Sequence, residues 1–260
     1  STDSSRIPDC YVEAASLLAH MRDSGLVGAI GERLRIRRQG GFPALDIVLL
    51  LLVYLSCGLR RGLRLVWREH LSRCGHLLGA LADRMRLPSP AAVSRALDSV
   101  EPDLIRPGIR WLLGEGAGID EVLQHPASSA WDTRGQPWHL FDLDPTVTTL
   151  RHRALPQDEE LPEPQRRSAD TGGAGYSGRK RGDIQFRRIA VQHAGSGAWV
   201  HSHLSAGNGE GVADLELGLD AVAATCDRLG APRARAMVRM DGEYGHVPGM
   251  TACRERGLPL

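Results

Sequence analysis

Two short apolar segments of this chain each lead into carboxylates. The apolar side chains favour a buried strand and the charged carboxylates favour water, so the fold must bury each segment and leave its acids exposed. The segments are Phe141–Thr146 and Val238–Tyr244. Side chains alternate along a strand, so Asp142 and Asp144 share one face about 7 Å apart, where they repel unless a cation or water lies between them. Asp241 ends the strand of the second segment. Brought together, the two segments predict a hard, oxygen-lined site for a divalent metal.

Each segment also has a simpler interpretation. Strand ends carry aspartate because they meet water, and the Asp-Pro pair at Asp144 and Pro145 is typical of a turn start. For either segment alone this simpler interpretation is favoured. The occurrence of both segments in one chain favours a site.

Composition bounds the class of protein. With 260 residues, 42% of them hydrophobic, the chain is long enough for a core and for two domains. Its net charge of +1 provides no overall field that would attract nucleic acid. Among its 32 basic residues, Lys180 is the single lysine. A GC-rich genome explains this bias most simply, although the arginine fork also suits phosphate oxygens.

The cysteines and the apolar runs bear on cellular location. Five cysteines without a Cys-x-x-Cys pair argue against a disulfide framework or a zinc cluster and fit a reducing cytoplasm. The apolar run Ile47–Cys57 is shorter than the roughly 20 residues that span a bilayer, so it predicts a buried helix. We expect no secretory signal and no membrane partner.

Residues 1–130 have the apolar spacing of helices. Val12–Met21 repeats apolar residues at helical intervals, and Ala44–Cys57 predicts a buried helix. Ser89 followed by Pro90 is typical of a capped helix start. The helix that follows carries a Ser-Arg pair and is compatible with helix-turn-helix DNA binding, but a plain bundle helix fits at least as well.

The pattern changes to strands over residues 138–260, after a polar stretch at Ser128–Pro137 that we interpret as a domain boundary. The prediction is therefore an α+β fold: an all-helical N-terminal region followed by a mixed domain, with a loop over Gln157–Gly175. The expected strand, hairpin, helix and final strand cover Trp138–Asp144, Ile189–Gln192 with Ala198–Leu204, Asp214–Leu229 and Ala236–Asp241.

Several motifs occur in a fixed order along the second half. Together they resemble those of DDE-type insertion-sequence transposases with an RNase H-like catalytic core, firmly over residues 140–257 and more thinly from residue 87. The motifs are Leu87-Pro88-Ser89-Pro90 with Ser94-Arg95, the Asp-x-Asp-x-Thr segment Asp142–Thr146, the Gly-Tyr-x-Gly-Arg-Lys-Arg-Gly stretch Gly175–Gly182, the turn Gly207-Asn208-Gly209, and the strand ending in Asp-x-x-Tyr-Gly, Val238–Gly245.

The resemblance implies roles for individual residues. Asp144 is expected to be the first catalytic, metal-binding aspartate and Asp241 the second, with Asp142 as a neighbouring metal ligand and Mg²⁺ or Mn²⁺ as the ion. The family's third acid, a glutamate on a later helix, has no counterpart, and Glu243 follows Asp241 too closely to replace it. We therefore expect a C-terminally incomplete catalytic domain.

The resemblance also implies partners. DNA, both element ends and target, is the expected partner of a homo-oligomer associated with the bacterial nucleoid, and no membrane is involved. The residues expected to contact the DNA backbone are Arg179, Lys180, Arg181, Arg187 and Arg188.

Two other functions remain open. The chain could be a truncated remnant that binds DNA or inhibits a full-length transposase without catalysis, or a metal-dependent nuclease with the same core. The histidines are weaker candidates. His139 is expected in the core or in solvent, and His201 with His203 forms a pair without an evident third metal ligand.

Overall fold

A computed structural model describes residues 6–34, 41–97, 99–100, 102–116, 119–125, 129–149, 173–176, 181–206 and 211–259. The chain divides into two compact units, Ser1–Leu112 and Leu113–Leu260, each with its own hydrophobic core. Along the described ranges, every helix is too short or too polar to cross a bilayer.

The first unit is all-helical in its described residues. Gly25, at φ 74°, separates the first two helices, and the Ser89 hydroxyl caps the sixth by accepting a hydrogen bond from the Ala92 N–H at 3.3 Å, as predicted. The elements are η1 (Asp9–Tyr11), α1 (Val12–Asp23), α2 (Leu26–Arg33), α3 (Ala44–Ser56), α4 (Leu63–Val66), a π-helical turn (Trp67–Leu71), α5 (Ser72–Ala80), α6 (Pro90–Leu97) and α7 (Pro102–Trp111).

Helix α3 supplies much of this unit's core because its sequence is apolar on nearly every side. Ile47, Leu49, Leu50 and Val53 are all at most 2% exposed. The prediction of a buried helix over Ala44–Cys57 is thus confirmed to within one residue.

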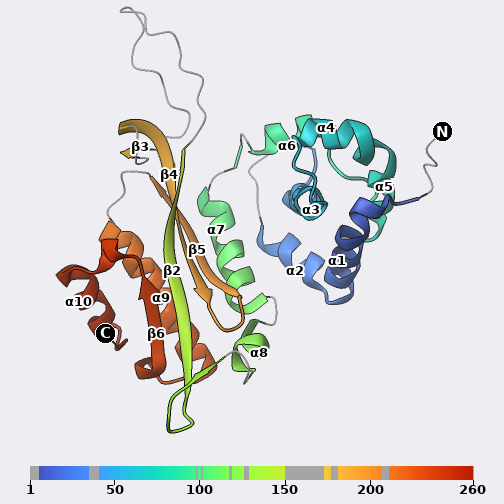
Figure 1. Cartoon of the computed structure of the whole chain (residues 1–260). Coiled ribbons are helices and arrows are strands. Elements are labelled where there is room, and N and C mark those ends of the chain that lie inside the picture. Colours follow the sequence, from blue (N-terminus) through green and yellow to red (C-terminus); the bar gives the residue numbers. More distant parts are fainter. Residues whose placement is uncertain are drawn as a thin grey trace, which may run out of the picture. The chain divides into compact units, whose positions relative to one another are not determined.

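The second unit combines one sheet with helices, so the fold is mixed α+β (Figure 1). Its elements are a π-helical turn that starts at the boundary (Leu112–Gly116), α8 (Ile119–Gln124), β1 (Ala130–Trp131), β2 (Pro137–Thr149), β3 (Gly173–Tyr176), β4 (Arg181–His193), β5 (Trp199–Ala206), α9 (Gly211–Leu229), η5 (Arg233–Arg235), β6 (Ala236–Met240), η6 (Gly242–Tyr244) and α10 (Val247–Glu255).

The sheet is built around β2 and β4. These two strands pair antiparallel, and β5 returns antiparallel along β4 after a tight turn in which Gly197 has φ 72°. After α9 the chain comes back as β6, which lies parallel to β2 on its other side. The order β6–β2–β4–β5 thus places the last strand beside the first long one, while β1 pairs with the start of β2 and β3 with the start of β4.

Helix α9 covers one face of this sheet (Figure 1). A Cβ built on Gly218 would meet Leu143 Cδ1 at 2.5 Å and Val191 Cγ2 at 3.3 Å, so the glycine permits a close approach of helix and sheet. Phe141 and Leu143 lie in this interface and are 0% and 2% exposed. The sheet that carries the predicted acids is therefore held by the packing of α9 against its opposite face.

The boundary between the units lies earlier than the polar stretch Ser128–Pro137. Helix α8 belongs to the second unit because Leu123, which is 0% exposed, packs in the core under the sheet. A polar stretch indicates where the chain is exposed to solvent. The unit to which α8 belongs depends instead on the hydrophobic core in which Leu123 packs.

Candidate metal and nucleic-acid site

The register of β2 and β6 brings the two predicted aspartates together. The last paired positions of this parallel ladder are Leu143 and Met240. The residues that follow them are Asp144 and Asp241. Neighbouring strands lie about 5 Å apart, and each aspartate directly follows the last paired residue of its strand, so both lie at the same end of the ladder.

Local sequence explains why the ladder stops there. Pro145 follows Asp144 and cannot donate a backbone hydrogen bond, which restricts it to a strand edge that has no partner. On the other strand, Gly242 opens the turn η6 directly after Asp241. β4 still pairs with β2 as far as Thr149, while among the described residues the pairing on the other side ends at Leu143.

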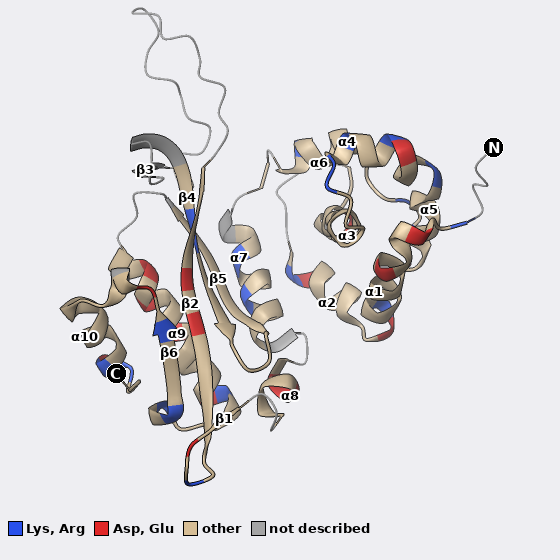
Figure 2. Ribbon diagram, in the orientation of Figure 1, with Lys and Arg blue, Asp and Glu red and all other residues tan. Residues whose placement is uncertain are grey.

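The two aspartates lie on the face of the sheet away from α9. Phe141 and Leu143 point into the core, so Asp142 and Asp144 point the other way, and Asp144 and Asp241 are both exposed. Figure 2 shows acidic positions in the middle of β2 and a basic position on the adjacent β6. The Thr146 hydroxyl, on the same face, lies 3.5 Å from Asp144 Oδ2.

Asp142 differs from Asp144 in having a cation opposite. Arg239 is its partner in the ladder and donates from Nε and Nη2 to the two carboxylate oxygens at 2.6 and 2.8 Å. These hydrogen bonds raise the pKa of the guanidinium. The cation that relieves the repulsion expected between Asp142 and Asp144 is therefore Arg239, whose ion-pair partner is Asp142.

The remaining donor set fits Mg²⁺. This ion keeps several waters and is commonly held by one or two carboxylates together with substrate phosphates, so it needs no cage of protein ligands. Asp144 and Asp241 supply two such carboxylates. No cluster of three or more His, Cys, Asp or Glu side chains that could hold a metal occurs among the described residues.

The predicted DNA-binding arginines have different surroundings. Arg188 is exposed, with its guanidinium carbon 5.8 Å from the centre of the Trp199 ring. Arg187 is buried, 8% exposed, and its Nη2 donates to the Tyr244 hydroxyl at 2.9 Å. Arg187 is therefore not exposed for the expected phosphate contact, because its guanidinium is buried and bound to groups within the second unit.

The other basic residues expected at DNA are Arg179, Lys180 and Arg181. Arg179 and Lys180 lie outside the described residues, as do the expected turn Gly207-Asn208-Gly209 and most of the expected loop Gln157–Gly175. Arg181 opens β4, and its backbone alone is described.

The burial of Arg187 was missed by motif reasoning, although strand alternation contains the signal. Along β4, Gln185, Ile189 and Val191 share its face, and each is 0% exposed. A charged residue on the same buried strand face needs a buried partner for its charge. Here the partners are Tyr244 and Asp214, the latter with Oδ2 3.9 Å from Arg187 Nε.

Two pairs of histidines occur in the same sheet. His139 Nδ1 lies 3.2 Å from His193 Nε2, and His193 Nδ1 lies 2.9 Å from the Ser196 hydroxyl. Burial, and secondarily His139, lowers the pKa of His193 to about 4. The rings of His201 and His203 stack with centroids 6.5 Å apart. The first pair is a core network, as one alternative for His139 anticipated.

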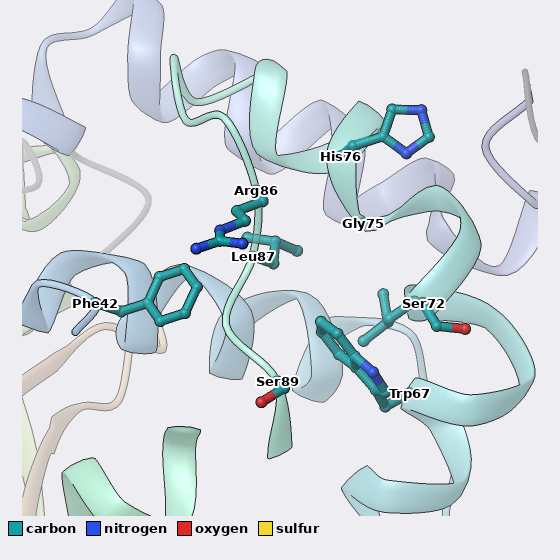
Figure 3. A pocket seen from close by; sticks show the side chains of 9 residues that line it. Phe42, Trp67, Ser72, Gly75, His76, Arg86, Leu87 and Ser89 are labelled. Atoms are coloured by element: carbon teal, nitrogen blue, oxygen red, sulfur yellow. The ribbon is translucent and has the colours of Figure 1, made fainter. Parts of the chain in front are cut away.

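The first unit contains a separate cavity of about 320 Å³ (Figure 3). Phe42 and Arg86 lie on one side of it and Trp67 on the other, with the Arg86 guanidinium carbon 5.2 Å from the centre of the Phe42 ring. The mixed aromatic and polar wall indicates no particular reaction. The remaining lining residues are Leu71, Ser72, Gly75, His76, Leu87 and Ser89.

Comparison with protein-family models, curated proteins and solved structures gives no significant match. The site is therefore assigned from its residues and their geometry.

Proposed function

We propose that this protein is a DNA transposase of the insertion-sequence type, in which Asp144 and Asp241 hold a divalent metal at a DNA phosphodiester. The observation that supports this most is the register of β2 and β6, whose last pair is followed on each strand by an exposed aspartate. Mg²⁺ is commonly held by one or two protein carboxylates together with substrate phosphates, and these two aspartates supply such carboxylates.

The proposal includes an RNase H-like core. Its support is the order of the elements: a long strand, a hairpin, a helix and a final strand that returns parallel to the first. The order puts the Asp-x-Asp-x-Thr and Asp-x-x-Tyr-Gly motifs on neighbouring strands, although about a hundred residues separate them in the sequence.

The chemistry consists of two in-line displacements at phosphorus. First a water oxygen bonds to phosphorus and loses a proton while the bond to the 3′-oxygen breaks, and the leaving 3′-oxygen gains a proton. The freed 3′-hydroxyl then bonds to a target phosphorus and loses its proton, while the displaced 3′-oxygen of the target gains one. Bound Mg²⁺ or Mn²⁺ supplies nucleophile activation and charge neutralisation in such sites.

The described protein groups have binding roles in this scheme. The carboxylates of Asp144 and Asp241 bind the ion, and Arg188 presents an exposed guanidinium for backbone contact. The run Arg179-Lys180-Arg181 is proposed as a further backbone contact on the strength of its motif. No protein nucleophile is required, because water and the DNA hydroxyl attack directly.

The test is cleavage and joining of supercoiled plasmid in the presence of Mn²⁺. In a protein that also supplies the third acid we expect nicking of the plasmid. Asp144→Asn or Asp241→Asn should then reduce nicking to the metal-free background while leaving DNA retention in gel shifts nearly intact. Asp23→Asn, an equal charge change on an exposed residue of α1, is the matched control.

The outcomes separate the candidate functions. Nicking that survives in either site variant contradicts the proposed site. Hydrolysis without any joined product supports a metal-dependent nuclease instead. Retention of DNA by a protein that neither nicks nor joins supports a binding or inhibitory product.

A further inference from the structure

A buried ion pair lies behind the proposed site. Arg187 on β4 and Asp214 in the first turn of α9 are 8% and 4% exposed, with Nε and Oδ2 3.9 Å apart. Asp214 Oδ2 also accepts a hydrogen bond from the Ser205 hydroxyl on β5 at 2.8 Å. Burying two charges costs several kcal/mol per ion unless they are well paired, so this network fixes β4, β5 and α9 relative to one another.

The same arginine reaches the turn that follows Asp241. Its Nη2 donates to the hydroxyl of Tyr244, and this ring is 1% exposed within the core. The Tyr244 N–H donates in turn to the carbonyl oxygen of Asp241 at 3.0 Å, which closes η6. A short path of contacts therefore runs from β4 through Tyr244 to the backbone of the second aspartate.

This path matters because Asp241 lies just beyond the ladder. The pairing of β6 with β2 ends at Met240. The position of Asp241 therefore depends strongly on the turn that begins with it. The turn is held at its far end by the buried Tyr244 ring, and α10 packs so closely there that a Cβ on Gly249 would lie 2.3 Å from the Tyr244 carbonyl oxygen.

We infer that Arg187 and Tyr244 are positioning residues for the second metal-binding aspartate. A carboxylate pair binds a metal well only when its supporting contacts hold it within about 0.5 Å of the required geometry. Arg187 holds the Tyr244 ring through the Tyr244 hydroxyl. Tyr244 in turn holds the backbone of Asp241 through the hydrogen bond that closes η6. The inference rests on the proposed function, because it presumes that Asp144 and Asp241 bind the metal.

The experiment is a titration of the full chain with Mn²⁺ alone, followed by electron paramagnetic resonance of the free ion. Tyr244→Phe keeps the buried ring and removes the group that accepts from Arg187. We expect its Kd for Mn²⁺ to rise roughly tenfold, with circular dichroism unchanged at the working temperature. The matched control is Tyr54→Phe, which removes one hydroxyl that donates to the Arg61 carbonyl oxygen in the first unit.

A second variant guards against a general loss of structure. Arg187→Lys retains a positive charge near Asp214 but lacks the fork that reaches both Asp214 and Tyr244. We expect it to weaken Mn²⁺ binding at least as much as Tyr244→Phe, while Tyr54→Phe binds like the unmodified protein.

The results distinguish the inference from the proposed function. If the unmodified chain binds Mn²⁺ and both network variants bind it equally well, the positioning role is refuted while the metal site stands. If the unmodified chain binds no Mn²⁺, the metal site itself fails and the inference fails with it.

Discussion

Asp142 and Asp144, two residues apart on one strand face, have opposite surroundings because of what lies across the ladder. Asp142 faces Arg239 and forms a bidentate ion pair, whereas Asp144 lies one residue beyond the last pair of that ladder, Leu143 with Met240. The alternation of side chains predicts the shared face correctly. The register that decides between the two acids depends on tertiary pairing, which the local sequence does not contain.

His193 makes a prediction at the same scale. Its pKa in the folded protein is about 4, below the ordinary 6.5, so the unfolded chain binds more protons between these values. The contribution of the neutral His193 to the free energy of unfolding is therefore fully present above pH 6.5 and is lost as the pH falls towards 4. Between pH 7 and pH 5 we expect a loss of about 2 kcal/mol, to which His139, whose pKa burial also lowers, adds in the same direction.

Urea unfolding at pH 7 and pH 5 measures this loss. His193→Gln removes the titrating ring but keeps hydrogen-bonding capacity, so its stability should fall less over the same interval. Carboxylates elsewhere titrate alike in both proteins and cancel in the comparison. An equal fall in the two proteins would refute the assignment of the acid sensitivity to His193.

At the scale of elements, helix and strand positions were largely predictable. The hairpin around Gly195-Ser196-Gly197 and the helix ending at Leu229 are confirmed, since turn residues and apolar periodicity are local signals. β2 is longer than expected and continues through Pro145 to Thr149. A proline in a strand argues for an edge, and the edge here arises because β6 ends.

Gly249 provides the prediction for packing between elements. An added Cβ would meet backbone, the Tyr244 carbonyl oxygen at 2.3 Å, so α10 or η6 must move. We expect Gly249→Ala to destabilise the second unit by about 1–3 kcal/mol. Gly28→Ala in α2 is the control, because nothing lies within 4 Å of its Cβ and alanine favours a helix.

Thermal or urea unfolding of the two alanine variants checks this expectation. Gly28→Ala should be neutral or stabilising. A Gly249→Ala protein as stable as the unmodified one would mean that α10 shifts freely, and Tyr244 would then be held less firmly than the packing indicates.

At the scale of the whole molecule, the chain consists of two units with separate cores, and the candidate site lies entirely in the second. The sequence predicted an all-helical part followed by a mixed α+β part, because the period of the apolar pattern changes between them. The two units divide between Leu112 and Leu113, ahead of the expected polar stretch, because Leu123 packs in the second core, and such long-range packing is not contained in a local pattern. The burial of Arg187 was missed for a different reason, because the alternation along β4 that indicates it was not applied to this residue.

The central claim is that Asp144 and Asp241 form one divalent-metal site, and Mn²⁺ binding by the whole chain tests it most directly. The account predicts saturable binding that is lost in Asp144→Asn and in Asp241→Asn, and retained in Asp23→Asn. Binding that persists with unchanged Kd in both site variants would contradict the account, because the adjacent aspartates would then have no metal to hold.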